Sequence, residues 1–227
     1  MNIYMDIQDL KKNFIKDELQ ITEEYGKVFA FIDFSNVNKW FENDDRDLEN
    51  ELLVEGKKVS IYLEGLKSFV DIFSERTRIY YGENPQNEKS LNFTHAMRKI
   101  FGKRDVMTKD IQKIKHYFET NEDTPEKYVE TDADGKKFIE IRKSNFDVEI
   151  SVDALKMFEH YNTFCIFSGD ADFVYLNNYL KKKGKKIIIV KGGHILSKFR
   201  TSADIVINAQ DIKKYITKIE DKKQRPD

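Results

Sequence analysis

The sequence predicts an α/β fold, a three-layer sandwich with a mostly parallel central sheet. Continuous apolar runs, which are typical of strands buried on both faces, occur at residues 28–32, 164–167 and 187–190. Segments with helical spacing of apolar residues alternate with these runs, as expected for strands joined by helical crossovers. Two of the runs end in carboxylates, and the carboxyl ends of parallel strands are where such folds bind ligands.

The N-terminal part is expected to contain an extension followed by the first strand. Residues 1–26 are charged and mildly amphipathic, which predicts one helix packed on the domain. The main domain is expected to span residues 27–218, and residues 219–227 form a polar tail. The domain begins with a buried strand at Val28–Asp33, and a polar turn at 34–38 opens a helix.

An insertion is expected within about residues 42–140. The extra length is attributed to a solvated acidic loop at 42–55 and a hairpin between 128–129 and 138–141. The same segment is predicted to contain an amphipathic helix at 61–73, a strand at 77–82, a helix at 93–101 and a segment at 106–118 that fits strand or helix. The hairpin signal is the dipeptide Asp134-Gly135. A calcium loop is disfavoured there because the bidentate Glu at its twelfth position is missing.

The C-terminal half repeats the alternation of helix and strand. The expected elements are a mostly buried helix at 146–160, a strand at 164–167, a helix at 173–183, and strands at 186–190 and 204–207. The turn Ser168-Gly169 separates the second of these elements from the third, and Asp170 or Asp172 can cap the helix that follows.

The 227-residue composition indicates one sizeable core without a bulk preference for nucleic acid. Lys and Arg number 39 against 40 Asp and Glu, so net charge predicts no polyanionic partner, although local patches can still matter. No apolar run approaches the roughly 18 residues of a membrane span, and the start lacks a signal-peptide pattern. Cys165 lies within an apolar run and is expected to be a buried, inert core residue. These features predict a cytoplasmic protein that does not contact membranes.

Four acids are predicted to lie together: Asp33, Asp170 and Asp172 after buried strands, and Asp147 where a helix begins. Like charges 4 Å apart at an effective dielectric near 20 repel by about 4 kcal/mol per pair. A divalent cation removes that cost, and oxygen ligands favour Mg²⁺ or Mn²⁺. Zinc is disfavoured because no His or Cys has ligand spacing.

Each of these residues also has an ordinary structural interpretation. Asp33 could simply end a strand, Asp147 could be an N-cap, and one of Asp170 and Asp172 could be a cap. Asn36 could cap the first helix. Asp153 lies on the expected polar face of its helix, where Lys156 can pair with it, so spacing alone favours a solvated side chain.

Three sequence blocks resemble the NYN domain, a PIN-like nuclease family that includes the LabA-like proteins. They are Ile32-Asp33-Phe34-Ser35-Asn36, residues 146–153 and Ser168-Gly169-Asp170-Ala171-Asp172-Phe173. Residues 184–187 and 202–206 match later family sequence, so the resemblance covers about residues 27–212. It implies a PIN-like sandwich and a metal-dependent ribonuclease that hydrolyses phosphodiester bonds with Mg²⁺ or Mn²⁺.

The resemblance also implies residue roles. Asp33, Asp147, Asp170 and Asp172 fall on the family's acidic positions as catalytic residues and metal ligands, and Asn36, Ser168 and Asp153 support them. This chain departs from the family in three places. Phe34 replaces a small residue and would narrow the cleft, Ser144 stands where a basic residue is usual, and the insertion is long.

The expected partner is RNA, which the resemblance implies rather than any single residue. Candidate nucleic-acid contacts are Lys143, Lys185, Lys198 and Arg200, although lysines at a helix end are commonly just solvated. The insertion could mediate a homodimer or bind a protein partner. The alternative function is a non-catalytic nucleic-acid-binding or scaffold module on the same fold. A phosphatase of the haloacid dehalogenase type is disfavoured because position 35 is Ser rather than the second Asp of its motif.

Overall fold

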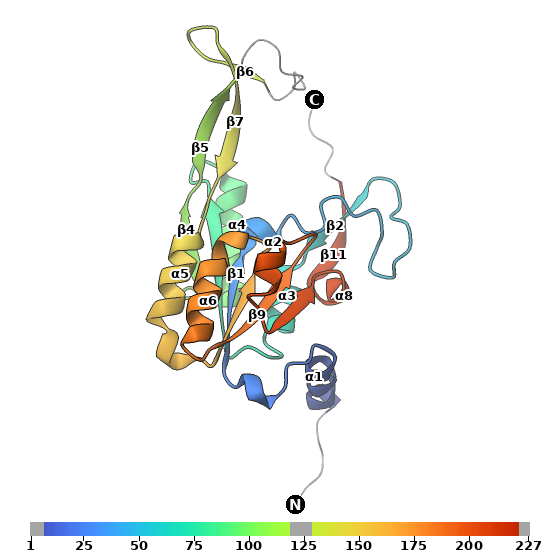
Figure 1. Cartoon of the computed structure of the whole chain (residues 1–227). Coiled ribbons are helices and arrows are strands. Elements are labelled where there is room, and N and C mark those ends of the chain that lie inside the picture. Colours follow the sequence, from blue (N-terminus) through green and yellow to red (C-terminus); the bar gives the residue numbers. More distant parts are fainter. Residues whose placement is uncertain (1–6, 119–128, 223–227) are drawn as a thin grey trace, which may run out of the picture.

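Six parallel strands form the central sheet in the computed structural model of the chain, which describes residues 7–118 and 129–222 (Figure 1). The strands, in spatial order, are β10 (Ile205–Asn208), β9 (Lys186–Lys191), β8 (Thr163–Phe167), β1 (Val28–Asp33), β3 (Arg76–Glu83) and β4 (Val106–Asp110). Every pair of neighbours is parallel. The predicted α/β class with a mostly parallel central sheet is confirmed.

The two central strands, β1 and β8, are buried along their whole length. Successive side chains of a strand point to opposite faces, so an unbroken apolar run serves two cores at once. Ile32 and Phe167 belong to the core on one face, and Phe31 and Ile166 to the core on the other. This double burial explains why both strands were recognisable from sequence.

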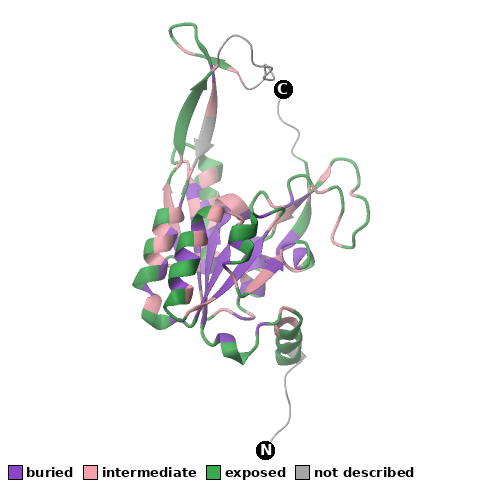
Figure 2. Cartoon of the chain, in the orientation of Figure 1, coloured by how far each residue is buried: buried purple, intermediate pink, exposed green. Residues whose placement is uncertain are grey.

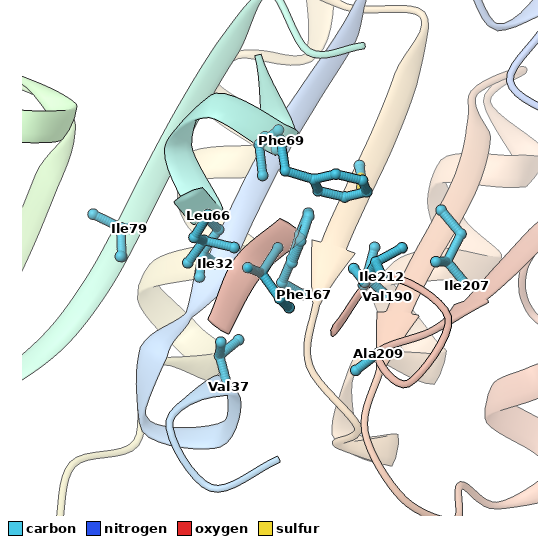
Figure 3. Packing of buried hydrophobic residues seen from close by; sticks show 14 of the residues in the cluster. Ile32, Val37, Leu66, Phe69, Ile79, Phe167, Val190, Ile207, Ala209 and Ile212 are labelled. Atoms are coloured by element: carbon cyan, nitrogen blue, oxygen red, sulfur yellow. The ribbon is translucent and has the colours of Figure 1, made fainter. Parts of the chain in front are cut away.

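Helices cover both faces and complete the three layers (Figure 2). On one face lie α3 (Leu63–Val70) and α4 (Glu88–Phe101); on the other lie α5 (Asp147–Lys156) and α6 (Val174–Lys182). Figure 3 shows the first core, where Leu66 and Phe69 of α3 lie over Ile32 and Phe167. Phe34 is buried in this same core beside Phe93, with ring centroids 5.4 Å apart, so its ring contributes to packing.

The strand order contains one reversal, between β1 and β8. From β1 the chain proceeds outward through β3 to β4, then returns to β8 beside β1 and proceeds outward through β9 to β10. Open parallel sheets bind ligands outside the carboxyl ends of their strands at such a switch point. The topology therefore places Asp33 and the loop after Phe167 at the position expected to carry chemistry.

Shorter elements connect and flank the three layers. They are α1 (Ile7–Glu18), the 3-10 helices η1 (Glu23–Tyr25), η3 (Phe158–His160) and η4 (Ala171–Phe173), and the short helices α2 (Phe34–Val37), α7 (Ser197–Arg200) and α8 (Lys213–Ile216). A separate two-stranded antiparallel sheet pairs β2 (Lys57–Ile61) with β11 (Thr217–Asp221). Residues 219–221, assigned to the polar tail from sequence, therefore form the end of β11. No helix in the described ranges has the length and apolar character needed to cross a membrane.

A three-stranded antiparallel arm projects from the edge of the domain (Figure 1). It contains β5 (Gln112–Tyr117), β6 (Glu130–Thr131) and β7 (Lys137–Lys143), with β5 and β6 each paired to β7. The ambiguous segment 106–118 is thus two strands, β4 and β5. The expected Asp-Gly turn joins β6 to β7, and Gly135 there has φ +78°, which favours glycine.

The acidic loop at 42–55 is mostly exposed, as expected, and it is anchored on α8, where the buried Lys213 ammonium lies 2.7 Å from Asp44 Oδ2 and donates to the carbonyl oxygen of Arg46. One expectation about exposure is wrong. The helix after Phe146 ends at Lys156 and is not mostly buried. Its apolar side chains lie on both faces, and Val148 is 72% exposed.

Candidate metal centre at the switch point

Three carboxylates gather beyond the carboxyl edge of the sheet: Asp147, Asp170 and Asp172. One oxygen of each lies within 4.8 Å of the others. Asp170 and Asp172 come from the segment that follows β8, whereas Asp147 is the first residue of α5. Such a cluster is the oxygen-rich donor set that Mg²⁺ or Mn²⁺ prefers.

Asp170 serves as a cap and keeps one oxygen available. Its Oδ1 accepts a hydrogen bond from Asp172 N at 3.0 Å, which caps η4, and its own N–H donates to Ser168 Oγ at 3.2 Å. Among the described residues, no hydrogen bond reaches Asp170 Oδ2. Capping and ligation are therefore compatible here, because they use different oxygens of one carboxylate.

Asp147 is not the cap of its helix. The N-cap position is occupied by Phe146, and the backbone N–H of Asp147 donates to Asn145 Oδ1 at 2.8 Å. Burial raises the pKa of the Asp147 carboxyl, and the charges of Asp170, Asp33 and Asp172 raise it further against the lowering effect of Asn145. The neighbouring acids thus disfavour the ionised form of Asp147.

Asp33 is the most buried of the four acids, with 6% of its surface exposed. Its Oδ1 accepts from Ser35 Oγ at 2.6 Å, and its Oδ2 accepts from Ser168 Oγ at 3.2 Å. Burial raises the pKa of Asp33, the two hydroxyls lower it, and the charge of Asp170 raises it. Asp33 is thus held beside the three gathered acids through Ser168, and it is not one of the three. Ser35 was not singled out from sequence.

Asn36 joins the two segments that meet at the switch point. Its Oδ1 accepts from Gly169 N at 3.1 Å and from Trp40 Nε1 at 2.8 Å. The indole of Trp40 stacks on Phe167, with ring centroids 6.4 Å apart and planes inclined by 15°. These contacts fix the amide, so its Nδ2 faces away from both donors. The role of Trp40 was missed from sequence, where its spacing of four from Asn36 on a helical segment was the available signal.

Asp153 does not join the acids. Its Oδ2 lies 2.5 Å from Arg78 Nη1 and accepts from Tyr80 Oη at 2.8 Å, so it fastens α5 to β3. The side chain is mostly buried, which contradicts the expected solvated pairing with Lys156. Helical spacing could not reveal this pairing because both partners come from a distant strand.

The predicted basic residues do not form one surface around the acids. Lys185 precedes β9 at the amino edge of the sheet, opposite the acids, and donates to the Tyr161 carbonyl at 2.6 Å, contrary to the expected substrate contact. Lys198 and Arg200 are exposed on α7, which follows the carboxyl end of β9. Lys143 ends β7, and its side chain lies outside the described part of the structure.

Lys109 supplies a cation near Asp147 that sequence reasoning missed. This residue of β4 donates to the Asn145 carbonyl, lies 2.6 Å from Glu149 Oε1 and sits 4.5 Å from the centre of the Phe146 ring. Lys109 therefore contacts residues on both sides of Asp147 at the first turn of α5. The contact joins residues 36 or more positions apart, which no local pattern could indicate.

Comparisons with known proteins identify the family and the fold. The chain is 31% identical over 90 residues to the low amplitude and bright protein LabA of Synechococcus elongatus, a match that covers 39% of this chain and 47% of that protein. It therefore spans less than half of that relative. A solved structure of a protein of unknown function from Vibrio parahaemolyticus superposes with a TM-score of 0.53 at 15% identity, covering 86% of this chain and 98% of the other, which shows the fold alone. The NYN domain profile matches residues 27–213. This chain belongs to the NYN domain family.

Proposed function

We propose that this protein is a metal-dependent ribonuclease that hydrolyses phosphodiester bonds. The observation that carries the proposal is the meeting of Asp147 with Asp170 and Asp172 at the switch point, within 4.8 Å. Three carboxylates with no salt-bridge partner among the described residues repel one another, and a cation bound between them would remove that repulsion. Membership of a family with a PIN-like nuclease fold supports the same chemistry.

The donor set fits Mg²⁺ or Mn²⁺, because carboxylate oxygens are the ligands these ions prefer. Asp147, Asp170 and Asp172 would hold the ion. Asp33 is proposed as a fourth acidic ligand, since its Oδ2 accepts one hydrogen bond and retains a further lone pair. When bound, such an ion activates water and stabilises charge that develops on the phosphate and the leaving oxygen.

The chain's own residues would then position the substrate. The fixed amide of Asn36 presents Nδ2 as a donor beside the segment that carries Asp170. Ser168 Oγ, which donates to Asp33 and accepts from Asp170 N, sets the spacing of those two acids. Lys109 holds the first turn of α5 and so fixes where Asp147 meets the other acids.

RNA is the proposed substrate, and Lys198, Arg200 and Lys143 are proposed contacts for its backbone. Exposed cations on α7 would neutralise phosphates next to the acids, since α7 follows the carboxyl end of β9. A cytoplasmic location and a protein partner or second copy bound through the insertion within about residues 42–140 remain predictions from sequence.

The test is a cleavage assay on a mixture of end-labelled RNAs with Mn²⁺, Mg²⁺ or EDTA. We expect wild type to cut in Mn²⁺ and not in EDTA, and Asp147→Asn and Asp170→Asn to lose at least about a hundredfold in rate. The matched control is Asp71→Asn, because Asp71 pairs with Lys67 on the α3 side of the sheet, away from the acids. This variant should cleave RNA at the wild-type rate. RNA binding without cleavage in any metal would favour the non-catalytic module instead.

A further inference from the structure

The outward surfaces of α5 and α6 expose large apolar side chains beside the acids. Val148 and Leu155 of α5 are 72% and 45% exposed, and Tyr175 and Tyr179 of α6 are 85% and 42% exposed. Figures 1 and 2 show the two helices side by side with exposed residues along their outer faces. Because the Tyr175 ring lies in solvent, it does not contribute to the packing of the core.

Helical spacing shows which residues continue from the acid cluster along the exposed surfaces of α5 and α6. We call the solvent-facing strip along these two neighbouring helices the seam. Residues three or four positions apart share one face of a helix, so Leu155 continues the face of α5 that begins with Asp147. On the other side, Tyr175 and Tyr179 continue the face that begins with Asp172, since η4 leads directly into α6. Asp147 and Asp172 meet in the acid cluster, so the starts of the two exposed faces adjoin each other there.

The α6 side of this seam combines aromatic rings with positive charge. Tyr175 comes one turn after Asp172, Tyr179 one turn later, and Lys183 a further turn along the same face. The ammonium of Lys183 lies 5.9 Å from the centre of the Tyr179 ring. At 1.5 Å per helical residue, the distance along the helix from Tyr175 to Lys183 is about 12 Å. Aromatic platforms interleaved with cations are what unpaired nucleic-acid strands bind.

We propose that the seam between α5 and α6 holds the unpaired nucleotides adjoining the cleaved bond, with a base stacked on Tyr175. This inference rests on the proposed ribonuclease function and adds Tyr175 as a residue that binds the RNA nucleotides next to the cleaved bond. Tyr175 selects unpaired bases because a paired base already has both faces stacked within its helix. A protein partner fits less well, since any protein that covered Tyr175 would also cover the adjoining Asp172 and close the acid cluster.

The first experiment measures binding of a fluorescent single-stranded RNA in EDTA, where hydrolysis does not contribute. Tyr175→Leu should weaken binding about five- to thirtyfold, because leucine keeps an apolar surface but loses base stacking, whereas Tyr175→Phe should bind as wild type does. The control is Tyr62→Leu, which replaces a tyrosine that is 39% exposed at the start of α3 on the opposite side of the sheet and should leave binding unchanged. Equal binding by Tyr175→Leu and wild type would overturn the inference.

A second experiment asks whether Tyr175 contacts a base. One abasic position is moved along the RNA in steps around the cleavage point, and binding is measured for wild type and Tyr175→Leu. At one position the abasic RNA should bind wild type as weakly as the variant binds intact RNA, and the two losses should not add. Additive losses at every position would contradict base stacking.

Failure of the inference differs from failure of the proposed function. If wild type cleaves and Tyr175→Leu binds and cleaves equally well, only the stacking role is lost. If wild type neither binds nor cleaves RNA, both proposals fall. If Tyr175→Leu alters the size of the protein in solution and leaves RNA binding unchanged, the seam is a protein contact and the inference is wrong.

Discussion

Asp170 shows how one side chain can satisfy two interpretations that the sequence leaves as alternatives. Its Oδ1 caps η4, and its Oδ2 is available to a cation. The sequence located Asp33, Asp170 and Asp172 because each follows a strand that is apolar throughout. It could not separate buried Asp33 from the gathered acids, because that difference comes from the hydroxyls of Ser35 and Ser168.

Replacement of Asp170 by Asn should stabilise the protein in the absence of metal. The charge of Asp170 raises the pKa of both Asp147 and Asp33, so removing it relieves repulsion, and Asn can still accept from Asp172 N. We expect a gain on the order of 1 kcal/mol, or about 2–4 °C in melting temperature measured in EDTA. With Mg²⁺ present, wild type should gain stability and the variant should gain less. A lower melting temperature of the variant in EDTA would show that repulsion is not what Asp170 contributes.

Trp40→Phe should impair positioning of Asn36 with little effect on stability. Phenylalanine retains the stacking on Phe167 but cannot donate to Asn36 Oδ1. We expect cleavage at saturating RNA to slow about tenfold, while the free energy of unfolding changes by about 1 kcal/mol or less. The double variant with Asn36→Ala should be no slower than Asn36→Ala alone. If the losses in cleavage rate of the two single variants add in the double variant, Trp40 does not act by positioning Asn36.

At the scale of elements, α5 is the part that brings two distant segments together. Its start carries Asp147 to the loop after β8, Lys109 holds its first turn, and Asp153 fastens its middle to β3. The sequence predicted the helix and the acid at its start. It overestimated the burial of α5, because apolar residues on its outer face resembled core residues in a pattern that records only residue type.

Asp153→Ala should destabilise the protein without weakening metal binding. It would leave the largely buried Arg78 guanidinium and Tyr80 hydroxyl without their shared partner. We expect a loss of about 2–4 kcal/mol in the free energy of unfolding by urea, because Arg78 would keep only the more distant Asp105, 3.8 Å from its Nε, and the Tyr80 hydroxyl would lose its acceptor. Asp71→Ala, which removes the surface pair with Lys67, should cost about 0.5 kcal/mol or less. Loss of the Mg²⁺-induced rise in melting temperature of Asp153→Ala would instead assign Asp153 to the metal site.

At the scale of the whole molecule, the switch between β1 and β8 decides where the acids lie. The alternation of strands and helices was sufficient to predict the sandwich and the edge of the sheet that carries the site. The arm was predicted only as a hairpin turn, because β5 is exposed along its length and has no apolar alternation. Pairing between β5 and β7 depends on long-range contacts that no local pattern records.

Shortening the arm should leave the domain folded. Phe138 is buried, yet it packs within the arm against Tyr117 and under Lys115 and belongs to neither face of the central core. We expect a variant in which an Asn-Gly turn joins Ile114 to Ile141 to melt within about 4 °C of wild type, because these residues are paired across β5 and β7. Size-exclusion chromatography with light scattering would show whether the arm holds two copies together. A large drop in melting temperature would mean that the arm supports the core.

The central claim is that Asp147, Asp170 and Asp172 form one cation site, and a calorimetric titration with Mn²⁺ tests it most directly. Wild type should bind Mn²⁺, and Asp147→Asn and Asp170→Asn should each weaken binding at least about tenfold, because each removes a charged ligand. Asp71→Asn, on the other side of the sheet, should bind as wild type does. Equal Mn²⁺ affinity in wild type and both site variants would contradict the claim.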